Sequence, residues 1–141
     1  MRTNAGDSLK TLRSKGHRIT KIRSLLIEVL QRHASPLTVA DLLAAIRKLG
    51  VEPHKTTLYR ELTFLVSESL AVELELGEGK KRYESAAKGH HHHLVCLGCR
   101  TIEELELGKH LPRQERKIRQ AYNFQVLRHS LEFFGLCQNC R

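Results

Sequence analysis

Apolar residues recur at intervals of three and four positions through the first half of the chain, which predicts a series of amphipathic helices. Polar capping residues and glycines mark where these helices begin and end. Thr38 and Asp41 have the spacing of a capping box, so a helix is predicted to begin there. The four predicted helices run from Asp7 to Gly16, from Thr20 onward, from Thr38 to Gly50, and across residues 55–69.

The pattern then changes to an alternation of apolar and polar residues. The segment AVELELGEGKKRYES (71–85) alternates on both sides of a GEGK turn and predicts a β-hairpin. Residues 86–89 are small and predict a hinge. Beyond them, HLVC, TIEELEL and FQVLRHSLEFFGLC predict strands that are interrupted by a basic helix, PRQERKIRQAY. We therefore expect an α+β protein, with a winged helix-turn-helix domain over 1–85 and a small α/β domain over 90–141.

The charge is concentrated where the helices are predicted. The chain has a formal net charge of +9, and residues 1–66 hold 12 lysines and arginines against 5 acidic residues. Such an excess predicts a polyanionic partner. No apolar run approaches the roughly 20 residues of a membrane span, and the N-terminal residues lack the apolar core of a secretory signal. We expect a cytoplasmic protein without a membrane partner.

The fourth predicted helix carries side chains suited to double-stranded DNA. Thr56 and Thr57 place hydroxyls at its start, where they suit phosphate contacts, and Tyr59 and Arg60 follow one turn later, where they suit base edges. The alternative is that these are ordinary surface residues. The predicted DNA-binding set also includes Lys15, Arg18 and Arg23.

Four cysteines form two CxxC pairs, CLGC at Cys96 and Cys99 and CQNC at Cys137 and Cys140. Two such knuckles together supply four thiolates for a tetrahedral Zn²⁺ site. Two disulfides or a thioredoxin-like redox pair are the alternatives, but a reducing cytoplasm disfavours the first and the second leaves one pair unexplained. With four protein ligands the site is closed, so its predicted role is to stabilise the second domain.

Four consecutive histidines precede the first cysteine pair. Because alternate side chains of a strand share a face, His91 and His93 are predicted to point one way and His90 and His92 the other. Imidazole is a common metal ligand, and carboxylates are available nearby. The alternative is a solvated polar turn. The candidate carboxylates are Glu73, Glu84, Glu103 and Glu104.

Taken together, these segments resemble the ferric uptake regulator (Fur) family of metal-responsive bacterial repressors. The matching segments are RITKIR (18–23), TTLYREL (56–62), HHHHLVCLGC (90–99), HSLEFFGLC (129–137) and the closing CQNC. The resemblance implies an N-terminal winged helix, a C-terminal dimerisation domain with a four-cysteine zinc site, and a regulatory metal where the domains meet. It implies a homodimer that binds a roughly palindromic operator.

The resemblance also implies ligands for two further metal sites. The regulatory hinge site takes Glu84, His91, His93 and Glu104. The family's remaining hinge histidine aligns with Ser35 or Pro36, so His33 or Glu73 is a possible replacement. The second site takes His90, His92 and His129, although His92 stands where an aspartate is common. Its expected carboxylate aligns near Pro112, and His110 is a possible replacement.

The function expected from this resemblance is metal-dependent repression of transcription in metal homeostasis, without enzymatic activity. The regulatory metal is Fe²⁺, Zn²⁺ or Mn²⁺, and a hinge of imidazoles and carboxylates favours iron by a small margin, because every cysteine is used by the knuckles. One alternative is a peroxide-sensing repressor on the same scaffold. The other is a metal-dependent hydrolase, but the sequence lacks a HExxH-type arrangement.

Overall fold

The computed structural model describes residues 4–108 and 110–141, and the chain divides into two compact units, Met1–Gly89 and His90–Arg141. We refer to them as the first and second unit. Among the described residues, no helix combines the length and apolar character that a bilayer crossing requires.

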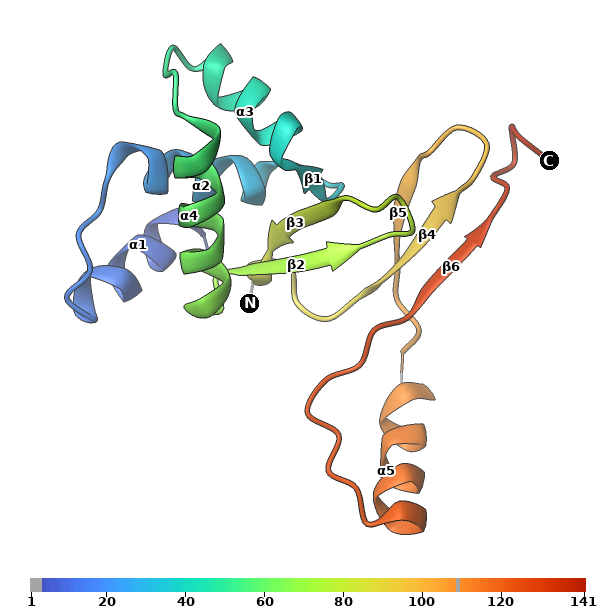
Figure 1. Cartoon of the computed structure of the whole chain (residues 1–141). Coiled ribbons are helices and arrows are strands. Elements are labelled where there is room, and N and C mark those ends of the chain that lie inside the picture. The colour runs from blue at the N-terminus through green and yellow to red at the C-terminus, as the bar shows by residue number, and fades with distance from the viewer. Residues whose placement is uncertain (1–3, 109) are drawn as a thin grey trace. The chain divides into compact units, whose positions relative to one another are not determined.

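The first unit is a winged helix-turn-helix (Figure 1). Strand β3 is the middle strand of its sheet and pairs antiparallel with β1 and with β2. The predicted hairpin is therefore present, with a third short strand that the sequence pattern did not indicate. Its elements are α1 (Ala5–Ser14), α2 (Lys21–Arg32), β1 (Leu37–Thr38), α3 (Val39–Lys48), α4 (Lys55–Ser67), β2 (Ala71–Glu75), β3 (Lys81–Ser85) and the 3₁₀ helix η1 (Ala86–Lys88).

Capping side chains set where these helices begin. The Thr20 hydroxyl accepts a hydrogen bond from the Arg23 amide at 3.2 Å, and Thr38 and Asp41 form both bonds of the predicted capping box. The first helix differs from the prediction. Its cap is Asn4, and Asp7 lies in the first turn, where its carboxylate accepts from the Asn4 amide. Asp7 therefore completes a capping box instead of beginning the helix.

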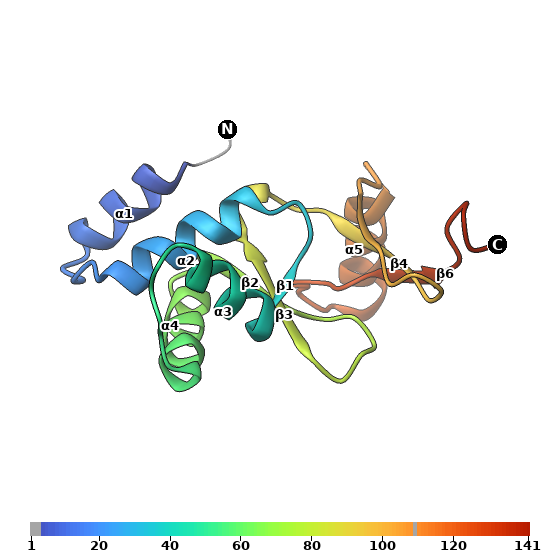
Figure 2. The same ribbon diagram turned by 90° about the horizontal axis from the view of Figure 1, so that it is seen from above.

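One apolar core holds the first unit together. In the two views of Figures 1 and 2, α1 and α2 lie side by side, and α4 lies against the start of the β2–β3 hairpin. Each of the four α-helices buries its apolar stripe in this core, which leaves the opposite face of each helix polar. The core residues are Leu12, Leu26, Ile27, Val29, Leu30, Val39, Leu42, Ile46, Leu58, Leu62, Leu65, Ala71 and Tyr83.

The second unit contains a three-stranded sheet and one helix. Its elements are β4 (His92–Cys96), β5 (Ile102–Leu105), α5 (His110–Tyr122) and β6 (Glu132–Gly135). Strand β4 is central, antiparallel to β5 and parallel to β6. The predicted strand through FQVLRHSLEFFGLC is too long, because residues 123–131 form an irregular segment along α5 and only Glu132–Gly135 pair with β4 (Figure 1).

Candidate metal centres and nucleic-acid interface

The four cysteines converge in the second unit. CLGC forms the turn after β4, and CQNC follows β6, the parallel neighbour of β4. All four thiols are free, and their Sγ atoms lie within 4.8 Å of one another. Four sulfur donors at this separation match the donor chemistry of a closed structural Zn²⁺ site.

The backbone around the knuckles favours thiolate at one sulfur. The amides of Cys137 and Cys99 point at Cys96 Sγ, at 3.3 and 3.5 Å, and these hydrogen bonds lower the pKa of Cys96 to about 6. Hydrogen bonding to the Cys137, Cys96 and Cys99 sulfurs raises the pKa of Cys140 to about 12. Without a metal, the four clustered thiols therefore do not all ionise together. A bound Zn²⁺ would stabilise all four as thiolates through its positive charge.

Gly98 permits the two knuckles to approach. A Cβ atom added at Gly98 would lie 2.9 Å from both Cβ and Sγ of Cys140. This distance is shorter than van der Waals contact allows, so a larger residue would push the second knuckle away. The middle of CLGC is thus constrained by the other pair, a constraint that the CxxC spacing alone did not reveal.

Three imidazoles form a second cluster, also within the second unit. Ligand atoms of His90, His92 and His129 lie within 4.8 Å of one another. The Nε2 atoms of His90 and His129 are 2.8 Å apart, and the His92 and His129 rings are stacked. Burial, reinforced by the His90 and His129 imidazoles, lowers the pKa of His92 and keeps it in the neutral form that binds metals.

Glu115 is the carboxylate of this cluster, and the sequence comparison missed it. It lies on α5, three residues beyond the expected position at Pro112. The His129 Nδ1 donates to Glu115 Oε1 at 2.6 Å, which turns Nε2 of the same ring toward His90. A carboxylate that orients a ligand histidine in this way is common around metal sites. The suggested replacement, His110, begins α5, and its side chain lies outside the described part of the structure.

His91 and His93 form a separate group with Glu104, apart from the cluster of His90, His92 and His129. The rings of His91 and His93 contact each other at 4.9 Å between centroids, and His91 Nε2 lies 3.9 Å from Glu104 Oε1. Glu104 is the register partner of His93 across β4 and β5, so the two side chains share a face of the sheet. Glu103 pairs with Leu94 and belongs to the opposite face.

The remaining hinge candidates belong to the first unit. Glu84 is on β3 opposite Val72. His33 caps the end of α2 and its Nδ1 donates to the Val29 carbonyl at 2.9 Å, which leaves Nε2 as the atom available to a metal. Glu73 on β2 accepts a hydrogen bond from the Tyr83 hydroxyl at 3.3 Å and pairs with Lys81 at 3.1 Å. Of the two proposed replacements, His33 therefore has the freer donor atom.

A polar stripe runs along the exposed side of α4. Its residues follow helical spacing opposite the buried Leu58, Leu62 and Leu65. Thr57 is half-buried and lies at the edge of this stripe, whereas Thr63, which sequence analysis did not select, lies within it. The exposed residues of α4 are Lys55, Thr56, Tyr59, Arg60, Thr63 and Ser67.

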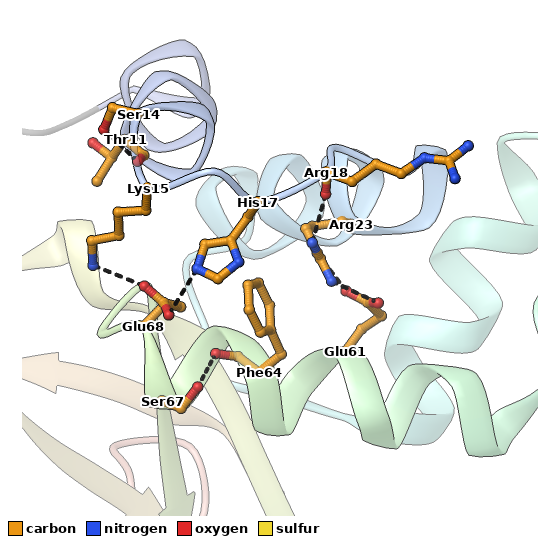
Figure 3. Close-up of polar contacts among 10 residues, drawn as sticks. All are labelled: Thr11, Ser14, Lys15, His17, Arg18, Arg23, Glu61, Phe64, Ser67 and Glu68. Atoms are coloured by element: carbon orange, nitrogen blue, oxygen red, sulfur yellow. Dashed lines mark hydrogen bonds and ion pairs between the residues drawn. The ribbon is translucent and has the colours of Figure 1, made fainter.

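The three basic residues predicted to accompany α4 differ in their contacts (Figure 3). Arg18 is exposed, and its side chain extends away from the other labelled residues. Lys15 pairs with Glu68 at 2.8 Å. Arg23 donates to Glu61 through both Nε and Nη2, and its side chain is only 13% exposed. The geometry favours a structural role for Arg23 over direct contact with DNA.

The second unit also exposes an unusual amount of apolar surface. Two phenylalanines of β6 and Leu94 of the adjoining β4 are each more than a third exposed. Leu94 and Phe133 are register partners and share a face of the sheet, and exposed apolar neighbours of this kind indicate a protein interface. The exposed apolar residues of this unit include Leu94, Leu97, Ile118, Tyr122, Phe124, Leu127, Phe133, Phe134 and Leu136.

We predict that Gly98→Ala weakens Zn²⁺ retention, because the added Cβ displaces Cys140. Gly135→Ala is the matched control, since nothing lies within 4 Å of a Cβ at that position. The measurement is Zn²⁺ release to a competing chelator, with a loss of about tenfold or more in affinity for Gly98→Ala, typical of a disturbed ligand shell. Equal retention in both variants would contradict this account of the knuckles.

Comparison with known proteins agrees with these features. The model of the ferric uptake regulator family matches residues 14–134. The ferric uptake regulation protein of Campylobacter jejuni is 30% identical over 135 residues, which cover 93% of this chain and 84% of that protein. The corresponding Helicobacter pylori protein is 28% identical over 131 residues, covering 93% and 87%.

Solved structures give the same result. The H. pylori ferric uptake regulator, described as having three functional metal binding sites, superposes with a TM-score of 0.84 at 27% identity and covers 99% of this chain and 95% of its own. The C. jejuni peroxide stress regulator superposes with a TM-score of 0.73 at 25% identity, covering 94% and 98%. Because the family model spans most of its length, the chain belongs to the ferric uptake regulator family of metal-responsive transcriptional regulators.

Proposed function

We propose that this protein is a homodimeric repressor whose binding to operator DNA requires a divalent metal at the hinge between its two units, and that it controls metal homeostasis. The observation that carries the proposal is the division of the histidine run. His91 and His93 gather with Glu104, whereas His90 and His92 gather with His129. One run thus supplies two separate sets of metal donors.

The proposed hinge site would take donors from both units, as the family resemblance implies. Glu84 on β3 would contribute a carboxylate, and His91, His93 and Glu104 of the second unit would contribute two imidazoles and a carboxylate. His33 is the proposed additional ligand. A divalent cation bound there would supply the positive charge that holds these donors together. Moving a two-state equilibrium from mostly open to mostly closed needs about 5.5 kcal/mol of differential binding, which several ligands together are able to provide.

The DNA-binding surface is proposed to centre on the exposed stripe of α4. The guanidinium of Arg60 and the hydroxyl of Tyr59 suit base edges, while the Thr56 hydroxyl and Arg18 suit phosphates. Thr57 is half-buried at the edge of the stripe. Lys15, which follows α1 and pairs with Glu68, also belongs to the proposed DNA-binding set. The basic charge of the first unit supports this assignment because it attracts the phosphate backbone before specific contacts form.

The exposed apolar residues of the second unit support pairing with a second copy of the chain. Leu94, Phe133 and Phe134 are apolar side chains on neighbouring strands that a partner would remove from water. A two-fold dimer presents two copies of α4 at a fixed spacing and requires a roughly palindromic operator.

Iron is the proposed physiological metal. Nitrogen and oxygen donors form both histidine clusters, while all four cysteines lie in the structural site. The relatives are named for ferric uptake, which supports iron over manganese or zinc.

A peroxide-sensing repressor is the second candidate, because the C. jejuni peroxide stress regulator shares the fold at 25% identity. Mass spectrometry of the Fe²⁺-loaded protein after peroxide treatment separates the two functions. A peroxide sensor gains oxygen on the peptide that contains His91. We expect an iron-responsive repressor to leave that peptide unmodified at peroxide concentrations that such a sensor detects.

We predict that His91→Ala abolishes metal-activated DNA binding but keeps the four-cysteine Zn²⁺ and the dimer, because it removes a hinge ligand only. His92→Ala affects the other cluster and should have the milder effect. DNA affinity measured against free metal for both variants and wild type tests this division. A stronger defect in His92→Ala, or no change in either variant, would show that the faces are wrongly assigned.

We further predict that Arg60→Ala lowers the preference for operator over random DNA by about 1 to 3 kcal/mol, the contribution of a good base contact. Arg47→Ala is the control, because it removes the same charge from an exposed pair with Glu52. The control variant should lower the affinity for operator and for random DNA by the same factor. If Arg60→Ala leaves the preference for operator over random DNA unchanged while metal content and dimerisation are normal, α4 is not the recognition helix.

A further inference from the structure

The loop between α1 and α2 is held against α4 by two groups of ionic contacts (Figure 3). One involves Arg23 at the start of α2 and Glu61 of α4. The other involves Lys15 and His17 of the loop and Glu68 near the end of α4. The contacts join residues that are 38 to 53 positions apart, so they link elements that are distant in the sequence.

All three guanidinium nitrogens of Arg23 donate hydrogen bonds to groups of the protein. Nε donates to Glu61 Oε2 at 2.8 Å and Nη2 donates to Oε1 at 3.1 Å, a bidentate pair of the strong type. Nη1 donates to the Arg18 carbonyl at 2.6 Å, and the guanidinium lies 3.9 Å from the Phe64 ring centroid. One side chain therefore fixes both α4 and the backbone that carries the exposed Arg18.

Glu68 makes the second attachment. Its carboxylate accepts from Lys15 Nζ at 2.8 Å and contacts His17 Nε2 at 3.1 Å, while the His17 ring packs edge-on against Phe64. The hydrogen bond from Lys15 is the main cause that lowers the pKa of Glu68, so this carboxylate is ionised at neutral pH. The loop is thus anchored at its beginning as well as at its end.

Glu61, Phe64 and Glu68 occupy one side of α4. Residues separated by three and seven positions share a helix face. The exposed stripe that contains Tyr59 and Arg60 is a different face of the same helix. A single helix therefore has one surface for the duplex and another for the loop that presents Arg18.

We propose that Glu61 and Glu68 are positioning residues for DNA binding, which fasten the α1–α2 loop to α4 so that Arg18 and the exposed stripe of α4 meet the duplex as one rigid surface. This inference rests on the proposed DNA-binding function. Holding contact residues in their bound arrangement raises affinity because less conformational entropy is lost on binding.

If these carboxylates only lie near the DNA and position nothing, removing their charge is expected to raise DNA affinity instead of lowering it. A carboxylate beside a phosphate backbone repels it, so removing its charge strengthens binding to every sequence. A positioning carboxylate behaves differently, because its loss releases Arg18 and weakens binding to the operator. Glutamine variants therefore distinguish the two roles by the direction of the change.

The experiment uses the full-length chain with Mn²⁺ and a duplex selected from a random pool by the wild-type protein. Glu61→Gln should lower affinity for that duplex about tenfold, which equals 1.4 kcal/mol, while affinity for an unselected duplex stays equal or rises. Glu28→Gln is the matched control. It changes the same charge, but its partner Arg32 is in the same helix, so no two elements come apart.

Arg23→Lys provides a second test that keeps the net charge. Lysine cannot form the bidentate pair, so this variant should lose as much operator affinity as Glu61→Gln. The double variant that combines Glu61→Gln with Arg23→Lys should lose no more operator affinity than either single variant, because both changes disrupt the same contact. If Glu61→Gln does not fold, Glu68→Gln and Arg23→Lys decide the question, with a loss of operator affinity in both expected.

Tighter operator binding by Glu61→Gln, or full affinity in Arg23→Lys, would overturn the positioning role. Additive losses in the double variant would overturn it as well. A failure of the proposed function looks different, because the wild-type chain would then select no preferred duplex with Mn²⁺, Fe²⁺ or Zn²⁺.

Discussion

The contact between the two cysteine knuckles is the constraint on which the second unit depends. Among its described residues, the buried apolar set is Val95, Cys96 and Ile102, too few to stabilise a unit of this size by burial alone. The knuckles connect the turn after β4 to the chain after β6, so they hold together the C-terminal ends of this parallel pair of strands. Metal held there contributes folding free energy directly, and the neighbouring histidine strand depends on that support.

Alternating side-chain directions separate His92 from His93 within β4, while His90 and His91 precede the strand and join the clusters of His92 and His93 respectively. Because successive side chains point to opposite faces, neighbours in sequence become members of different sites. His92 is buried and neutral beside His129, whereas His93 stands across from Glu104.

Much of this arrangement could be predicted from the sequence, because helical periodicity, the Thr38 capping box and the CxxC spacing are local signals. The features that the sequence did not reveal depend on which of several polar groups pair with each other in the folded chain. Asp7 resembled a cap, but Asn4 takes that position. Glu115 joins His129 from a helix, and no spacing rule links them. Arg23 is predicted to contact DNA, and its guanidinium forms a bidentate pair with Glu61, 38 positions away in the sequence.

The proposed function joins these parts through differential binding, since a metal is able to activate the protein only if it binds the DNA-competent arrangement more tightly. The most direct measurement is operator affinity as a function of free Fe²⁺, with the four-cysteine site kept loaded with Zn²⁺. The account predicts an increase of about ten- to a hundredfold as the hinge fills, within the usual range of coupling between sites. An operator affinity that is the same with and without the second metal would contradict it.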